Sequence, residues 1–205
     1  MDDFARTLVS EAESLTATPG RSLRVLVGMT GASGAAYAVD FLRRCPGQKY
    51  LVMSKWARAV LHAETGLREE DLALHVKARF SDSDLAAPFA SGSNPLDALV
   101  ILPCSTSTAA KIAAGIGDTL ITRAAQVALK ERRRLVVAVR ETPLSTIQLE
   151  ALARLSREGA VVFPLSPPWY GKPETVGDLV SATTAKLLRL LGVEVPGGWR
   201  EEDLE

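Results

Sequence analysis

The adjacent charged residues Arg140 and Glu141 follow a run of apolar, mostly β-branched residues at 135–139. Such a run predicts a buried strand, and Thr142 and Pro143 suit the N-cap and first turn of a helix. The charged pair would then lie at the carboxyl end of a strand, where open α/β sheets bind ligands. A cation beside a carboxylate at a helix N-terminus favours a phosphorylated substrate that is also protonated. A strand-end salt bridge explains the pair equally well.

A glycine-rich segment, Gly28-Met-Thr-Gly31-Ala-Ser-Gly34, follows the predicted strand 23–28 and opens a predicted helix. Glycines let backbone N–H groups approach a phosphate, and the helix dipole assists. The spacing departs from G-x-G-x-x-G, and the next predicted strand, 50–53, ends in Ser54 rather than in an acidic residue. A mononucleotide such as FMN therefore suits the segment better than NAD. The alternative is a tight turn with a purely structural role.

Four consecutive hydroxyl residues come after the predicted strand 97–102, at the start of a predicted helix. They are Ser105, Thr106, Ser107 and Thr108. Either Ser105 or Thr106 is explained as a helix cap. Because capping needs only one of them, the excess indicates hydrogen bonds to a phosphate or to a flavin ring.

Two lysines and an arginine on predicted helices are weaker candidates. Arg123 and Lys130 are two helical turns apart and share one face of the predicted helix 119–130. Lys186 lies on the last predicted helix, 176–191. A solvated basic surface accounts for all three residues when they are taken alone.

The segment after the last predicted strand is rich in proline and aromatic residues. Three prolines stiffen residues 164–170 and present Trp169 and Tyr170 at the same edge of the sheet. The Tyr170 phenol could bind a phosphate, or the aromatic residues could merely cover the core.

Strand and helix signals alternate along the chain with short connections. This alternation predicts a three-layer α/β/α Rossmann-like domain with a mostly parallel sheet. One domain is expected at 21–195, with an N-terminal extension at 1–20 and a tail at 196–205. The predicted strands are 23–28, 50–53, 74–80, 97–102, 135–139 and 160–163. The first predicted helix follows the glycine-rich segment and ends near residue 44. The other predicted helices are 54–65, 106–114, 119–130, 143–157 and 176–191.

The composition excludes several classes of protein. The 24 basic and 24 acidic residues balance, so no overall field favours nucleic acid or membrane. Two cysteines are too few for a disulfide framework, and neither a signal peptide nor a run of transmembrane length is recognisable. A cytoplasmic protein is expected. The two histidines lack metal-ligand spacing, so no metal site is predicted.

Taken together, these segments resemble the flavin prenyltransferase family of UbiX type, formerly called aromatic-acid decarboxylases. The likeness spans about residues 23–192, and the block 130–143 is its most specific part. The other matching stretches are 28–34, 91–93, 103–118 and 164–170. Mild departures are Thr106-Ser107, where the family often has Met-Gly, and Pro168-Trp169, where it often has Ala-Phe.

The resemblance implies a metal-independent enzyme that joins the dimethylallyl group of dimethylallyl phosphate to N5 and C6 of reduced FMN. The product, prenylated FMN, would serve a partner decarboxylase of UbiD type. The family likeness further implies a homo-dodecamer with sites shared between subunits, and Trp199 near the tail could be an anchor at an interface.

Roles for individual residues follow from the same resemblance. FMN would be bound by Gly31, Ala32, Ser33, Ser54, Ser105, Thr106, Ser107, Thr108 and Arg140. The prenyl phosphate would be held or acted on by Lys130, Glu141, Tyr170 and Lys186, with Arg123 as a helper. Lys130, Lys186 and Tyr170 would stabilise the departing phosphate, and Glu141 would donate and later accept a proton. Either Glu141 or the released phosphate could take the final proton.

Two other readings remain open. A flavin-dependent cysteine decarboxylase of the phosphopantothenoylcysteine type would share the fold but would need a histidine near the flavin. A non-catalytic FMN carrier of flavodoxin type would leave Lys130, Glu141, Tyr170 and Lys186 without a role.

Overall fold

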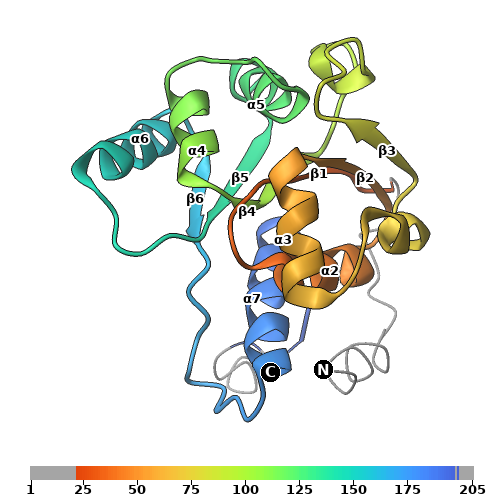
Figure 1. Ribbon diagram of the computed structural model, residues 1–205, viewed down its shortest axis with the longest axis vertical. Helices are drawn as coiled ribbons and strands as arrows, with labels where there is room; N and C mark the ends of the chain where they lie inside the picture. The colour runs from red at the N-terminus through yellow and green to blue at the C-terminus, as the bar shows by residue number, and fades with distance from the viewer. Residues whose placement is uncertain (1–21, 197, 199–205) are drawn as a thin grey trace.

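The computed structural model describes residues 22–196 and 198, and it centres on one parallel six-stranded sheet (Figure 1). The predicted extension at 1–20 and the predicted anchor Trp199 lie outside the described residues. The strands are β1 (Arg24–Met29), β2 (Gln48–Met53), β3 (Ala78–Ser81), β4 (Ala98–Cys104), β5 (Arg134–Val139) and β6 (Val161–Pro164). Their order in the sheet is β3-β2-β1-β4-β5-β6.

This strand order places a crevice at the centre of the sheet. From β1 the chain first extends the sheet through β2 and β3, and it then returns to pair β4 with the other side of β1. In doubly wound sheets ligands bind outside the carboxyl ends of the strands at such a reversal. The ends of β1 and β4 are therefore the expected centre of a site.

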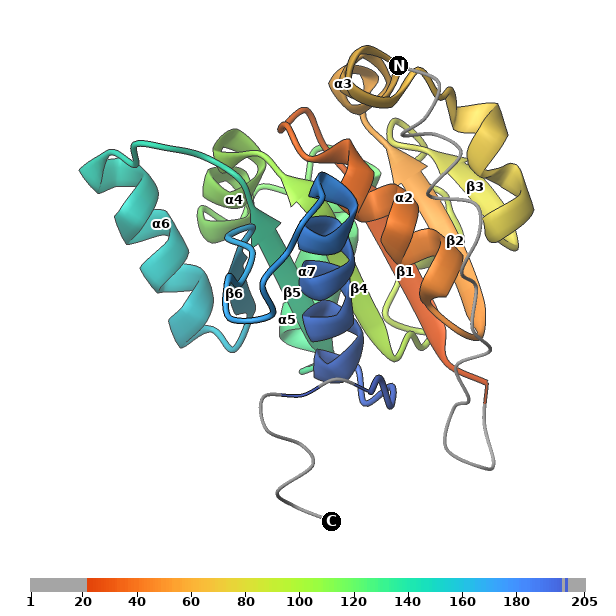
Figure 2. The ribbon, with the colours of Figure 1, turned by 90° about the horizontal axis from the view of Figure 1, so that it is seen from below.

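Helices cover both faces of the sheet, which confirms the predicted three-layer architecture. The helices are α2 (Ala35–Arg44), α3 (Lys55–Thr65), α4 (Thr106–Ala113), α5 (Leu120–Lys130), α6 (Thr146–Arg157) and α7 (Val176–Leu190), with short 3₁₀ helices η1 (Glu69–His75) and η2 (Pro88–Ala90). Figure 2 shows α2 and α7 side by side over one face, where their apolar residues join one core cluster. Residues of α4, α5 and α6 pack into a second cluster on the opposite face.

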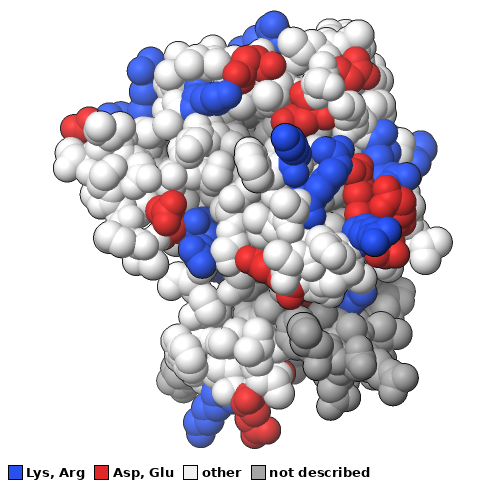
Figure 3. All heavy atoms as spheres, viewed as in Figure 1, with Lys and Arg blue, Asp and Glu red and all other residues white. Residues whose placement is uncertain are grey.

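The surface and the helices agree with the sequence on two further points. On the face drawn in Figure 3, acidic and basic side chains are interspersed rather than gathered by sign. Among the described residues, no helix is both long enough and apolar enough to cross a membrane.

The predicted strand 74–80 is wrong in its first half. Leu74 and His75 belong to η1, and β3 covers only Ala78–Ser81. Three acidic residues in the first turn of η1 favour a helix start, because the helix N-terminus attracts negative charge. The Asp71 carboxylate also accepts a hydrogen bond from the Arg68 amide at 2.7 Å. These local contacts outweigh the alternating pattern.

The predicted start of the helix after β5 is also wrong. Helix α6 begins at Thr146, and its N-cap is Ser145 rather than Thr142. Ser145 and Gln148 form a capping box: the Ser145 hydroxyl accepts from the Gln148 amide, and Gln148 Oε1 accepts from the Ser145 amide at 2.8 Å. Because this reciprocal pair satisfies two backbone donors, it fixes the start of the helix beyond Pro143.

Candidate active site

A cavity of about 370 Å³ opens at the carboxyl edge of the sheet. Its walls come from the segments that follow β1, β2, β3 and β4. The lining residues are Thr30, Gly31, Ser54, Trp56, Asp82, Ser105, Ser107, Thr108, Lys111, Thr119, Ile121 and Thr122. Five of them, Gly31, Ser54, Ser105, Ser107 and Thr108, were predicted from the sequence.

Three helices begin at this cavity. Their N-cap residues are Ser54 for α3, Ser105 for α4 and Thr119 for α5, and each cap side chain accepts a backbone hydrogen bond. Helix N-termini carry partial positive charge, so all three favour an anion in the cavity. The sequence predicted two of these caps at ligand-binding strand ends and the third only as a helix start.

The turn after β1 is held against the end of β4. The Thr30 amide donates to the Pro103 carbonyl at 3.1 Å, and the Thr30 hydroxyl accepts from the Ser105 amide at 2.7 Å. A side chain at position 31 would place its Cβ only 2.6 Å from Cβ of Trp56. Glycine is therefore required at position 31, and its bare backbone forms part of the cavity wall.

The four consecutive hydroxyl residues have different tasks. The Ser105 hydroxyl caps α4 and lies 3.0 Å from the Thr108 hydroxyl. The Thr106 hydroxyl accepts a hydrogen bond from Gln148 Nε2 at 3.0 Å and so ties α4 to α6, outside the cavity lining. Ser107 and Thr108 line the cavity, as predicted for groups that contact a ligand.

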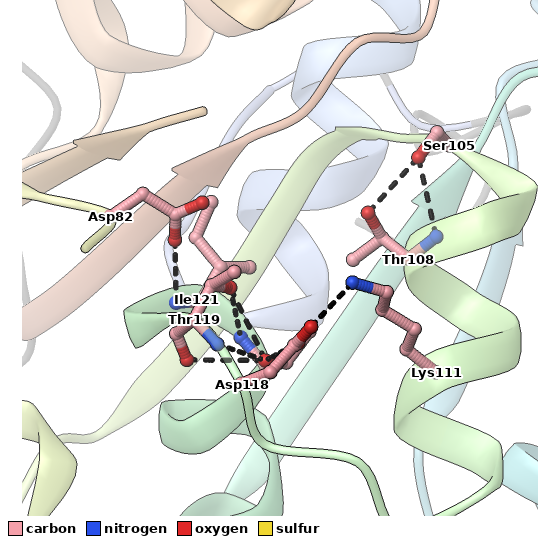
Figure 4. A network of polar contacts seen from close by, with 8 residues as sticks. Asp82, Ser105, Thr108, Lys111, Asp118, Thr119 and Ile121 are labelled. Atoms are coloured by element: carbon pink, nitrogen blue, oxygen red, sulfur yellow. Dashed lines mark hydrogen bonds and ion pairs between the residues drawn. The ribbon is translucent and has the colours of Figure 1, made fainter. Parts of the chain in front are cut away.

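Two charged residues that line the cavity, Lys111 and Asp82, were not predicted from the sequence. Lys111 Nζ donates to Asp118 Oδ2 at 2.6 Å, and this hydrogen bond holds the pKa of the Asp118 carboxyl below its usual range (Figure 4). Asp82 Oδ1 accepts from the Ile121 amide at 3.0 Å at the start of α5. Lys111 comes three residues after Thr108 and four residues after Ser107. In a helix this spacing places the side chains on one face, so the sequence could have indicated Lys111 as a further residue of the cavity.

Arg140 and Glu141 directly follow the end of β5, as predicted, and both are exposed. In the described part of the chain they form no ion pair with each other, and Glu141 Oε1 accepts a hydrogen bond from the Thr142 amide at 3.1 Å. Arg140 lies near Tyr37 of α2. Burial raises the pKa of the Tyr37 phenol, whereas a hydrogen bond to Thr183 and the charge of Arg140 lower it. Arg140 and Glu141 therefore have different neighbours.

Lys130 and Lys186 lie away from the cavity, toward the amino edge of the sheet. Lys130 ends α5 four residues before β5 starts, and its Nζ pairs with Glu131 Oε1 at 2.7 Å. Lys186 stands one turn before Leu190, whose carbonyl accepts a hydrogen bond from the Arg134 side chain at the start of β5. A single chain therefore does not bring these lysines to the predicted flavin site.

The amino edge carries a second polar patch that includes another segment of the sequence resemblance. A Cβ atom at Gly92 would lie 3.2 Å from Lys130 Nζ, and the Arg133 side chain donates to the Gly92 carbonyl. Segment 91–93 and Lys130 therefore lie together. Arg123, in the first turn of α5, and Tyr170, on the loop between β6 and α7, are exposed and do not line the cavity.

Comparison with known proteins places this site in a family. A family model described as Flavoprotein matches residues 13–188. A flavin prenyltransferase UbiX of Thermoplasma acidophilum is 48% identical over 172 residues, which cover 83% of this chain and 96% of that protein. The chain thus belongs to the flavoprotein family and, within it, to the flavin prenyltransferases.

Solved structures agree with this membership. The crystal structure of AnUbiX (PadA1) in complex with FMN and dimethylallyl pyrophosphate is 40% identical, with a TM-score of 0.83, and the match covers 88% of this chain and 100% of that one. A dodecameric FMN-dependent UbiX-like decarboxylase from Escherichia coli O157:H7 is 41% identical, also with a TM-score of 0.83, over 86% and 99% of the two chains. The family predicted from the sequence is confirmed.

Proposed function

We propose that this protein is a flavin prenyltransferase that joins the dimethylallyl group of dimethylallyl phosphate to N5 and C6 of reduced FMN. Identity of 48% to a flavin prenyltransferase over most of both chains carries the proposal. The cavity at the β1–β4 reversal supports it, because the lining combines anion-binding helix ends with hydroxyl groups. The product would be prenylated FMN.

The residues of the cavity suit FMN. A monoanionic or dianionic phosphate matches the bare backbone at Gly31, the neighbouring Ala32 and Ser33, and the start of α3 at Ser54. Hydroxyls of Ser105, Ser107 and Thr108 would contact the rest of the cofactor, and Arg140 would approach it from the end of β5. When bound in reduced form, FMN supplies the nucleophilic positions of the reaction.

The groups assigned to the prenyl phosphate lie at two opposite edges of the sheet. Glu141 follows β5 at the carboxyl edge, whereas Lys130 and Lys186 lie toward the amino edge. We therefore place a complete site between subunits, where one copy supplies the cavity and another supplies lysines. The dodecameric state of the E. coli relative supports a homo-dodecamer.

Each assigned side chain has a defined chemical task. Cleavage of the allylic C–O bond leaves an anionic phosphate, which Lys130, Lys186 and Tyr170 stabilise, with Arg123 as a helper. Glu141 donates a proton to the reacting prenyl group and later accepts one. Lysines that neutralise a monophosphate take the place of a metal ion in this scheme.

A second enzyme must use the product, prenylated FMN. We assign that role to a decarboxylase of UbiD type that takes up prenylated FMN, and we place the reaction in the cytoplasm. The two free, buried cysteines of the described chain suit a reducing compartment.

The decisive experiment is an anaerobic incubation with reduced FMN and dimethylallyl phosphate, followed by mass spectrometry of the flavin. We expect the flavin to gain one five-carbon unit. An unchanged flavin would overturn the proposal. A cysteine decarboxylase would instead release CO₂ from a cysteine-containing substrate, and it would require a histidine that the described cavity lining does not contain.

A further inference from the structure

The helix after β1 is where related folds bind a second phosphate. In dinucleotide-binding sheets with the strand order seen here, the pyrophosphate lies on the N-terminus of this first helix. The corresponding helix in this protein is α2, which begins after Gly34. Gly34 has a φ of 111° and provides no side-chain cap, so the first amides of α2 need another acceptor.

Glu64 supplies that acceptor from another helix. Its Oε2 accepts hydrogen bonds from the Gly34 amide at 2.9 Å and from the Ala35 amide at 2.8 Å. Its Oε1 lies 3.3 Å from the Gly34 amide. These are the donors that a phosphate at the start of α2 would use. A carboxylate of the protein itself therefore occupies this anion-binding position.

The position of Glu64 in its own helix is unfavourable. Glu64 is the penultimate residue of α3, and negative charge near a helix C-terminus opposes the dipole. The stability of α3 thus does not explain a glutamate here, whereas its contacts with α2 do. The sequence predicted that the dipole of α2 would assist phosphate binding, and in the structure the Glu64 carboxylate accepts hydrogen bonds from the first amides of this helix.

A phosphate group of the cofactor can therefore bind in the cavity rather than on α2. The backbone of Gly31 and the N-terminus of α3 at Ser54 both line the cavity. The residues after β2 are Ser54, Lys55 and Trp56, so the acidic residue that binds a dinucleotide ribose is also replaced. Two independent features of the chain thus oppose a dinucleotide.

We propose that Glu64 is a specificity-determining residue that restricts the cavity to a mononucleotide. Its carboxylate holds the first amides of α2 and repels a second phosphate group. FMN, with one phosphate, is accepted, whereas FAD and nicotinamide dinucleotides are rejected. This inference rests on the proposed binding of FMN and adds the reason for the choice among nucleotides.

The test compares the dissociation constants of FMN and FAD by isothermal titration calorimetry for the full-length wild type, Glu64→Gln and Glu64→Asp. We expect the wild type to prefer FMN by roughly 100-fold or more, and Glu64→Gln to lower that preference by about tenfold, because a nearby unit charge is removed. Glu64→Asp keeps the charge and should keep most of the preference. Glu70→Gln, which removes an exposed charge on η1, is the matched control.

The outcomes separate this inference from the proposed function. An FMN/FAD ratio that is the same in Glu64→Gln and the wild type, with FMN still bound, would overturn the role of Glu64. Equal wild-type affinity for the two flavins would do the same. Failure of the wild type to bind FMN at all would instead contradict the proposed function. Thermal unfolding of each variant shows whether the loss of a cap, rather than of a charge, lowers the affinity for both flavins together.

Discussion

At the scale of single residues, Glu141 is the carboxylate that we propose for proton transfer in the reaction. It lies two residues after the end of β5, its side chain is exposed, and its Oε1 accepts a hydrogen bond from the Thr142 amide. Arg140 beside it lies near Tyr37 instead, so the two charges are free for different partners. A site that both binds an anion and transfers a proton needs its cation and its carboxylate to be separate in this way.

We expect Glu141→Gln to keep FMN binding and to lose most prenylation. Glutamine preserves the size of the side chain but cannot donate and accept the proton, so turnover should fall by about 10²- to 10⁴-fold. Single-turnover formation of prenylated FMN, followed by mass spectrometry, measures the loss. Glu150→Gln, an exposed position on α6, serves as the control. Wild-type turnover in Glu141→Gln would remove Glu141 from the mechanism.

At the scale of elements, caps decide where the helices around the site begin. Ser54, Ser105 and Thr119 start three helices at the cavity, and the capping box of Ser145 and Gln148 starts α6. The segment 140–144 therefore stays outside the helix and leaves Arg140 and Glu141 in a loop. A helix that began at Pro143 would have shortened this loop.

Replacement of Ser145 by alanine should destabilise the protein, whereas the same change at Thr142 should not. Loss of an N-cap hydroxyl costs about 1 kcal/mol, because the Gln148 amide loses its acceptor. Urea unfolding followed by circular dichroism compares the two variants. A larger loss of stability in Thr142→Ala than in Ser145→Ala would favour the earlier helix start.

At the scale of the whole molecule, the proposed catalytic groups are divided between the two edges of the sheet. The flavin cavity and Glu141 lie at the carboxyl edge, and Lys130 lies at the amino edge beside segment 91–93. Within one chain these groups cannot meet, because the sheet and the two core clusters packed on its faces separate the carboxyl edge from the amino edge. Assembly of several copies of the chain would bring the two edges together and complete the site.

Co-expression of two inactive variants tests this division. Lys130→Ala removes the amino-edge group, and Glu141→Gln removes the carboxyl-edge group. In mixed oligomers some sites combine an intact half from each variant, so activity should recover to about a quarter of the wild type if mixing is random. Separate tags allow the mixed oligomer to be purified. Recovery of no activity in verified mixed oligomers would place both groups in the same chain's site.

Buried thiols make the stability of the fold sensitive to alkaline pH. Burial raises the pKa of Cys45 from 9.0 to about 12, although the nearby Lys49 ammonium opposes the rise. Because the folded state keeps this proton while the unfolded chain loses it, the free energy of unfolding should fall above pH 9. The expected slope is about 1.4 kcal/mol per pH unit for this thiol, until the pH reaches its folded pKa.

Urea unfolding at pH 7.5, 9 and 10.5 under reducing conditions measures this dependence, with Cys45→Ala as the comparison. The variant should show a shallower loss of stability with pH than the wild type. A parallel pH dependence in both proteins would assign the alkaline loss to other groups.

The order of strands and helices, the family, and five of the twelve residues that line the cavity were predicted from the sequence. Gly31, Ser54, Ser105, Ser107 and Thr108 stand at strand ends, and parallel strands bring their carboxyl ends to one edge. Local patterns are sufficient for this, because each strand or helix depends mainly on residues close in the chain.

The tertiary structure decided the contacts that join distant segments. It placed Lys111 in the cavity and paired it with Asp118, turned Thr106 toward α6, and carried Lys130 to the opposite edge from Glu141. It also brought Glu64 to the start of α2, 29 residues earlier in the chain. No local pattern encodes such pairings, because they depend on how helices pack over the sheet after each element has formed.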